Sequence, residues 1–175
     1  MTKSLFIILP LLILIQASCK KDNTPDNSGT VTIDNTTLFA QTYYVYGFLF
    51  SEGKEVSTLD SPPPDITVDS DGTNLLLQAN NLKNSFYKAG EYPDASSAET
   101  AYKNLTTASI PETNWLGLAN PLKKNQVWIY RSGTSHYAKF RIISTIAEIR
   151  SERNYAECTF EWAYQPDGTL TFPGK

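Results

Sequence analysis

Alternation of apolar and polar residues is the strongest pattern in the chain, and it predicts β-strands. The clearest example is YAECTFEWAY, residues 155–164, where every second residue is apolar: Ala156, Cys158, Phe160, Trp162 and Tyr164. Successive side chains of a strand point to opposite faces, so these five predict a buried face. Glu157, Thr159 and Glu161 lie between them and predict a face toward water.

More strands are predicted in the first half of the chain. The aromatic part of TYYVYGFLFSEGKEV, residues 42–56, is apolar at nearly every position, which indicates a strand buried on both faces and central in a sheet. The prolines of SPPPD, residues 61–65, lack backbone donors and end that element. Residues 66–68 and 74–79, joined by DSDGT, predict a hairpin, and residues 84–92 predict an irregular strand or a loop.

The C-terminal part of the chain also predicts strands. They are QVWIYRS from Gln126, HYAKFRIISTIAEI from His136, the strand around Cys158, and TLTF from Thr169. Gly133 suits a tight turn between the first two. In the second of these strands apolar residues alternate with Lys139 and Arg141, and we expect these two cations to face water.

One helix is predicted in DASSAETAYKNL, residues 94–105. Its apolar residues recur at helical spacing on one face: Ala98, Ala101, Tyr102 and Leu105. Ser96 and Glu99 have the spacing of a capping box, and Asp94 is an equally good N-cap, so two starting points are open. Several strands with one short helix predict a mainly β (α+β) fold.

The N-terminal segment has a different pattern. The run from Leu5 to Ile15 contains one proline and is otherwise apolar, but it is shorter than the roughly 20 apolar residues that span a bilayer. It therefore predicts the core of a signal peptide. The following QASC ends at Cys19 and resembles the lipobox of bacterial lipoproteins, with Gln16 in place of the usual Leu.

That resemblance implies cleavage before Cys19 and acylation of its sulfur and amino group, and two or more acyl chains anchor a protein stably. A looser lipobox followed by KKD is similar to those of Bacteroidota-type lipoproteins, and Lys20 favours the outer membrane. An ordinary signal peptide with a chance cysteine is the alternative. Either way we expect a signal peptide at residues 1–18, a flexible tether at 19–30 and one β-rich domain at 31–175.

Charge and composition narrow the classes of partner. Residues 20–30 hold almost no apolar side chain and cannot bury enough surface to offset the entropy of ordering. Loss of residues 1–18 removes Lys3 and no acidic residue, so the formal net charge falls from −3 to −4. Mild acidity without a basic stripe argues against a nucleic-acid partner.

Candidate reactive side chains are few. His136 is the single histidine and a candidate metal ligand, but metal and triad sites need partners at suitable spacing, so an exposed turn histidine is favoured. Lipidation of Cys19 would leave Cys158 as the one thiol, and its place on an apolar face predicts a buried, inert residue. DSDG, residues 69–72, is half of a calcium loop, but Gln78 replaces the expected Glu, which favours a hairpin turn.

Tryptophans are the remaining candidates for ligand contact. Trp162 follows the apolar face of its strand and predicts a core position, whereas Trp128 is compatible with either face. Trp115 lies in a connection, so it is the best candidate for a surface contact among the tryptophans, but an anchor against the core is favoured for a tryptophan in a loop. We take Trp115 and Trp128 as candidate ligand-binding residues and predict no catalytic residue.

A family resemblance adds to these patterns. VWIYRSGTSHYAKFRIIS followed by CTFEWAYQPDGTLTF, with GTVTIDN near residue 29 and YGFLFSEGKEV near residue 46, resembles HmuY-like lipoproteins. The resemblance implies an antiparallel two-sheet domain and haem capture at the cell surface for delivery to a transporter. Such capture uses two axial His or Met side chains. Here His136 lies in a C-terminal turn and Met1 leaves with the signal peptide, so no cofactor is predicted.

The sequence thus predicts a membrane-anchored, non-catalytic binding lipoprotein of the outer membrane. Its ligand would be haem, another small molecule, a glycan or a partner protein. A structural subunit of an outer-membrane assembly is the second interpretation, and an enzyme is a distant third.

The anchor can be tested directly. Cells that express the protein with labelled palmitate should incorporate the label into it, and the protein should sediment with the membranes, because the acyl chains transfer to the bilayer. A mature protein in the soluble fraction, with an unmodified first residue, would contradict lipidation at Cys19.

Overall fold

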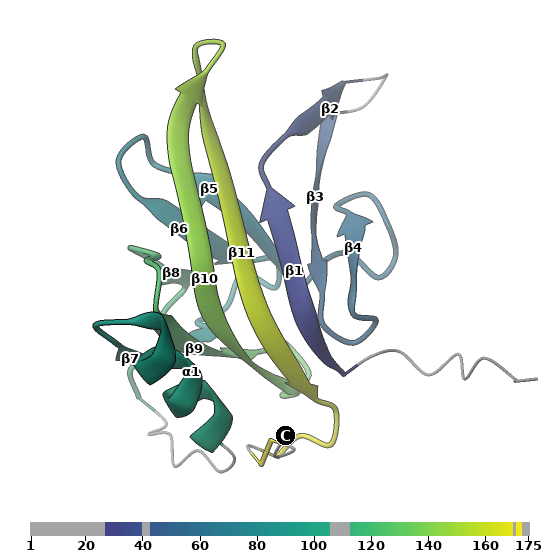
Figure 1. Cartoon of the computed structure of the whole chain (residues 1–175). Helices are drawn as coiled ribbons and strands as arrows, with labels where there is room; N and C mark the ends of the chain where they lie inside the picture. Colours follow the sequence, from purple (N-terminus) through teal and green to yellow (C-terminus); the bar gives the residue numbers. More distant parts are fainter. Residues whose placement is uncertain (1–26, 40–42, 106–112, 170, 173–175) are drawn as a thin grey trace, which may run out of the picture.

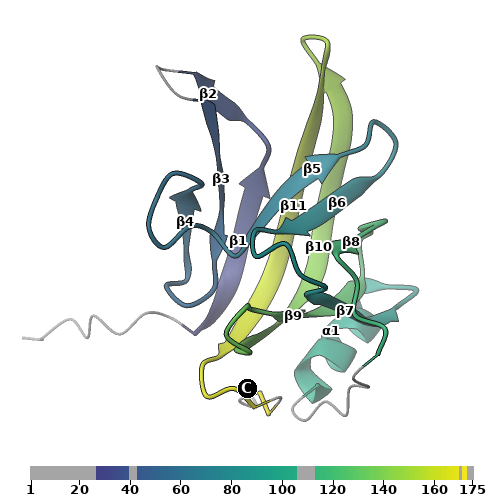
Figure 2. The same cartoon turned by 180° about the vertical axis from the view of Figure 1, so that it is seen from behind.

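The protein folds as two antiparallel sheets in a computed structural model (Figures 1 and 2). The structure describes residues 27–39, 43–105, 113–169 and 171–172. Across the first sheet the strands are β1 (Ser28–Asp34), β11 (Arg153–Gln165), β10 (Tyr137–Arg150), β9 (Gln126–Arg131) and β7 (Phe86–Glu91). Across the second they are β2 (Thr37–Phe39), β3 (Tyr43–Leu49), β5 (Ile66–Ser70), β6 (Leu75–Ala79) and β8 (Leu118–Ala119), with β4 (Lys54–Ser57) paired to β3.

The described residues contain one helix, α1 (Ala95–Asn104), which packs on the outer face of the first sheet against β9 and β10 (Figure 1). The predicted mainly β, two-sheet fold with one short helix is therefore confirmed. Asp94 is the N-cap, since its side chain accepts a hydrogen bond of 2.7 Å from the backbone N–H of Ser97. Within the described ranges no helix has the length and apolar character that crossing a bilayer requires.

Aromatic side chains fill the space between the sheets. The ring centroids of Phe48 and Trp162 lie 5.0 Å apart, and those of Phe50 and Tyr130 lie 5.3 Å apart. Such pairs contribute roughly 0.5–1.5 kcal/mol beyond the area they bury. Cys158 lies in the same cluster and is fully buried, and this desolvation raises the pKa of its thiol. The predicted burial of Cys158 is confirmed.

The strand predicted in the aromatic part of residues 42–56 is β3, and the polar remainder of that stretch forms a turn and the partner strand β4 of a hairpin. The chain turns after Leu49, with a hydrogen bond from the N–H of Gly53 to the carbonyl of Phe50, and returns as β4. The predicted central position is confirmed, because β3 has partners along both edges. A Cβ at position 47 would collide with the carbonyl oxygen of Ile66, so Gly47 allows β3 and β5 to approach closely.

The other predicted elements have mixed outcomes. The hairpin of β5 and β6 is confirmed, and residues 84–92 contain β7, with a bulge between Lys88 and Gly90. β1 begins at Ser28, inside the predicted tether of 19–30, because its backbone pairs with β11. The predicted strand TLTF is wrong, since the described residues there belong to no strand and Phe172 is buried beside Ile129 instead.

The expectation that Lys139 and Arg141 face water is also wrong, because α1 covers this face of β10. Lys139 is only 3 % exposed, and its Nζ donates hydrogen bonds of 2.8 Å and 3.0 Å to the carbonyls of Tyr102 and Leu105 at the end of α1. The carbonyl of Tyr102 also accepts a bond of 3.3 Å from the N–H of the C-cap residue Leu105, so Lys139 adds a second donor there. Beside it, Arg141 and Glu161 form an ion pair of 2.9 Å that is largely shielded from solvent. The ammonium of Lys139 thus fastens the helix to the sheet.

Replacement of Lys139 by Met should lower the free energy of unfolding by about 1–3 kcal/mol, because buried carbonyls lose a charged donor while the aliphatic volume is kept. Lys103→Met is the matched control: this lysine is exposed and pairs with Glu99 on the helix surface, so the expected change is below about 0.5 kcal/mol. Urea unfolding measures both variants. Equal changes in the free energy of unfolding of the two variants would contradict the conclusion that Lys139 holds α1 against the sheet.

Candidate functional site

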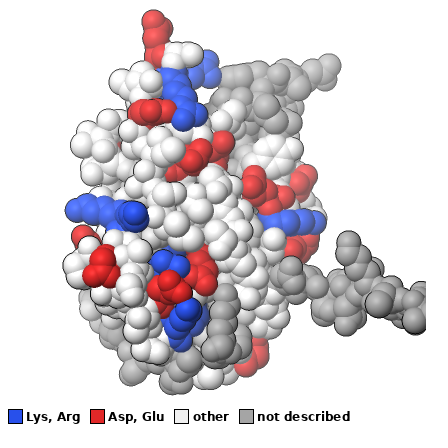
Figure 3. All heavy atoms as spheres, in the orientation of Figure 1, with Lys and Arg blue, Asp and Glu red and all other residues white. Residues whose placement is uncertain are grey.

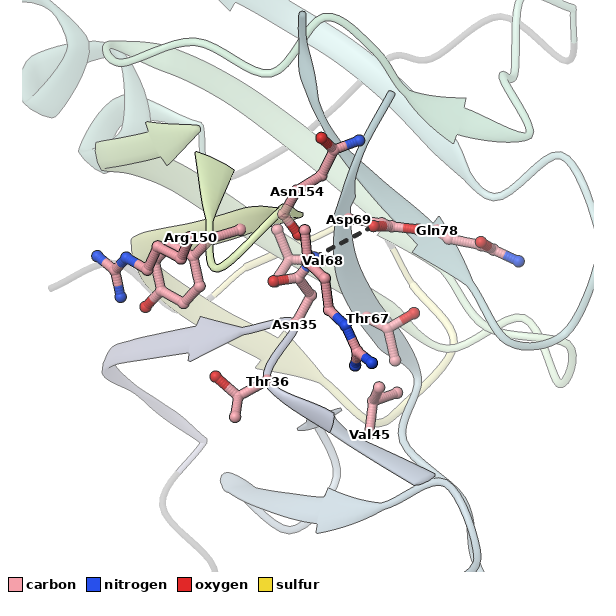
Figure 4. A pocket seen from close by; sticks show the side chains of 11 residues that line it. Asn35, Thr36, Val45, Thr67, Val68, Asp69, Gln78, Arg150 and Asn154 are labelled. Carbon is pink, nitrogen blue, oxygen red and sulfur yellow. Dashed lines mark hydrogen bonds between the residues drawn. The ribbon is translucent and has the colours of Figure 1, made fainter. Parts of the chain in front are cut away.

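A polar cleft of about 600 Å³ lies at one end of the sandwich, between the β10–β11 hairpin, the corner that joins β1 to β2, and strands β3, β5 and β6 (Figure 4). A ligand site of ordinary size occupies roughly 300–1,000 Å³. Eleven residues line the cleft: Asn35, Thr36, Val45, Thr67, Val68, Asp69, Gln78, Arg150, Arg153, Asn154 and Tyr155.

One wall of the cleft is an arm made by residues 143–156 of β10, β11 and their turn. β9 pairs with β10 only as far as Arg141, and a register shift follows between Ile142 and Ser144, so beyond it β10 pairs with β11 alone. Ser151 and Glu152 close the arm with φ values of 49° and 64°. Positive φ at both residues is typical of a two-residue hairpin turn that matches strand twist.

Asn35 holds the cleft together where β1 ends. Its Oδ1 accepts a hydrogen bond of 2.9 Å from the N–H of Ala156, and its Nδ2 donates bonds of 2.9 Å to the carbonyl of Asn154 and 3.3 Å to Asp69 Oδ1. Figure 4 shows the bond to Asp69 in the middle of the cleft. The side-chain amide of Asn35 therefore links the arm on the first sheet to β5 on the second.

Tyr155 and Arg150 form the rim on the arm. The guanidinium of Arg150 lies 3.4 Å from the centroid of the Tyr155 ring, and its Nε donates to Glu148 Oε1 at 2.5 Å. The Tyr155 hydroxyl donates a bond of 2.6 Å to Glu157. Burial and this bond raise the pKa of Tyr155 to about 12, so the phenol stays neutral at physiological pH. The rim presents a fixed cation above a neutral ring.

The remaining lining supplies mixed hydrogen-bonding groups. Gln78 and Asn154 are exposed amides, each able to donate and accept, and Thr67 is a half-buried hydroxyl. Asp69 adds an exposed carboxylate. Side chains of this kind bind a polar ligand that has several hydroxyl or carboxylate groups.

The two candidate tryptophans do not line this cleft. Trp128 is 1 % exposed, and its indole N–H donates a bond of 3.0 Å to Gln126 Oε1 in the interior. Trp115 is 9 % exposed and packs on the core, with the guanidinium of Arg131 4.2 Å from its ring centroid. The structure does not bring Trp115 and Trp128 together, and the favoured anchoring role of Trp115 is confirmed.

His136 lies in the turn between β9 and β10, as predicted, but at the far end of β10 from the cleft. It is half-buried rather than exposed, and its Nδ1 is 3.1 Å from the Tyr164 hydroxyl.

The DSDG turn is confirmed, with Asp71 accepting bonds from the N–H groups of Thr73 and Asn74. The described ranges contain no cluster of three or more His, Cys, Asp or Glu side chains placed to hold a metal ion. Cys19 lies outside the described residues.

No family model matches this sequence, and no curated protein is significantly similar to it. The resemblance to HmuY-like lipoproteins therefore stays a prediction from its motifs.

Sequence patterns did not single out the residues that form the cleft. Asn35, Gln78 and Asn154 come from three separate segments, and each is an ordinary polar residue in its local context. The one usable signal is RSERN, residues 150–154, a fully polar stretch between two strongly patterned strands. It marks a hairpin tip, but it does not show what the tip faces.

Replacement of Asn35 by Ala should lower the free energy of unfolding by about 1–3 kcal/mol, because three hydrogen bonds are lost and the backbone N–H of Ala156 loses its acceptor. Hydrogen exchange should also become faster along the arm. Asn104→Ala, at an exposed helix position, is the control and should change stability by less than about 0.5 kcal/mol. An Asn35→Ala variant as stable as the control would show that the amide does not hold the arm.

Proposed function

We propose that this protein is a non-catalytic, lipid-anchored binding protein of the cell envelope, attached to the outer membrane through Cys19, and that its cleft binds a glycan. The observation that carries the proposal is the cleft itself. Two sheets hold amide, hydroxyl, carboxylate and guanidinium groups around a concavity of about 600 Å³. Sugars present neighbouring hydroxyl groups, which planar side chains of this kind bind in pairs.

Apolar and charged groups refine the class of ligand. Val45 is half-buried and supplies apolar surface beside the polar groups, and this suits the C–H face of a sugar ring. Two cationic side chains, Arg150 and Arg153, and one acidic side chain, Asp69, belong to the lining, and Arg150 is paired with Glu148 beside it. A guanidinium is a bidentate donor to carboxylate and sulfate groups, so the proposal favours a glycan that carries such groups.

Haem fits this lining poorly. The described residues of the cleft include neither His nor Met, and Tyr155 already donates its hydroxyl hydrogen to Glu157. Axial ligation by such a pair of side chains has no donors there. This chemistry supports the expectation that the protein differs from haem carriers in its ligand.

The lining also favours binding without turnover. Hydrolysis of a glycosidic bond by the usual mechanism needs two carboxyl groups on opposite sides of the bond. The cleft has one, Asp69, and it is exposed and bonded to Asn35.

The surface charge bears on a different class of partner. On the face drawn in Figure 3, cationic and anionic side chains are interspersed, which supports the expectation that nucleic acid is not a partner.

The proposal can be tested with the mature chain that carries Cys19→Ala, applied to an array of neutral and acidic oligosaccharides. Binding to acidic members is expected, and Gln78→Ala and Asn154→Ala should each weaken it by about ten-fold, the loss of one or two hydrogen bonds. Asn104→Ala removes an exposed amide elsewhere and should bind normally. An empty array, or full binding by both cleft variants, would refute glycan binding at this cleft.

A further inference from the structure

A second pocket, of about 570 Å³, lies at the opposite end of the sandwich from the cleft. The two sites share strands but not residues: β3 contributes Val45 to the cleft and Leu49 to the second pocket, and β11 contributes Tyr155 and Tyr164 in the same way. The residues 62–64, three consecutive prolines, form one wall, so we name this site the proline pocket.

Asp65 is the charged centre of the proline pocket. Its Oδ2 accepts a hydrogen bond of 2.9 Å from the N–H of Phe50, and its Oδ1 accepts one of 3.1 Å from the Tyr130 hydroxyl. Burial raises the pKa of this carboxyl, while these hydrogen bonds and the charge of a protonated His136 oppose the shift. No Lys or Arg among the described residues forms an ion pair with Asp65.

The groups around Asp65 favour a cation over an anion. Pro62 and Pro63 supply exposed apolar surface, and the hydroxyl of the buried Tyr130 donates to Asp65. A carboxylate attracts cations and repels anions. A carboxylate has about four lone-pair positions, and the protein uses two at Asp65, so further donors can be accepted.

We propose that the proline pocket binds a small organic cation: a primary ammonium group on a short apolar chain. The ammonium donates to the carboxylate of Asp65, and the chain lies against Pro62 and Pro63. A carboxylate already removed from water gains more from such a partner than an exposed one, because little further desolvation is needed. A bare metal ion is less suited, since this lining offers one carboxylate and one imidazole among apolar side chains.

The probe for this site is n-butylammonium chloride, with 1-butanol as the neutral molecule of the same chain length and sodium chloride to match ionic strength. NMR titration of the mature chain carrying Cys19→Ala should show saturable shifts at the N–H groups of Phe50 and Asp65. A dissociation constant in the millimolar range is expected for a ligand of this size, and 1-butanol should bind at least about ten-fold more weakly.

Asp65→Asn is the variant that removes the charge while keeping an acceptor for Phe50. It should bind n-butylammonium at least about ten-fold more weakly, because the charge-assisted bond is lost. Asp60→Asn is the matched control. It removes a negative charge on the other side of the prolines, where Asp60 caps the N–H of Ser57, and it should bind like the parent protein.

Two results would overturn the proposal: equal binding of butanol and butylammonium to the parent protein, or undiminished binding by a folded Asp65→Asn variant. The comparison of butanol with butylammonium needs no substitution, so it tests the proposed cation site even where Asp65→Asn fails to fold. The glycan cleft is untouched by these variants, so a failure here leaves the array result unaffected.

Discussion

The pairing of β10 with β11 is the interaction on which both ends of the molecule depend. The ladder runs from Tyr137 opposite Gln165 to Arg150 opposite Arg153. At one end it places Tyr164 beside His136 in the proline pocket, and at the other it places the arm over the second sheet. Because a slip by one residue would move every side chain to the other face, the register of this hairpin fixes the chemistry of both sites.

Two polar side chains, the half-buried Asn35 and the buried Lys139, complete the backbone hydrogen bonding where regular structure stops. Asn35 continues the β1–β11 ladder by one more pair of bonds, with its amide in place of a peptide group. Lys139 donates to the carbonyls of Tyr102 and Leu105 at the C-terminal end of α1, where regular helical hydrogen bonding stops. Each side chain takes its place because backbone groups shielded from water need a hydrogen-bond partner.

Residue patterns predicted much of the fold and little of the cleft. Alternation placed Cys158 and Trp162 on a buried face correctly, because the hydrophobic effect acts on each strand separately. It failed at Lys139, since periodicity shows which residues share a face but not that a helix covers it. The cleft could not be predicted for the same reason. Asn35 and Gln78 line the same cleft only because two sheets pack together, and neither residue has a local signature.

The early start of β1 has a consequence for how the proposed lipoprotein stands on its membrane. Asn27 is held beside Tyr164 by a backbone hydrogen bond of 2.7 Å, so the chain leaves the domain next to the proline pocket. From Cys19 to that point a fully extended chain reaches at most about 30 Å. The proline pocket would then be proximal to the bilayer, within reach of amine-bearing headgroups, while the arm and its cleft point outward to meet long polymers arriving from solution.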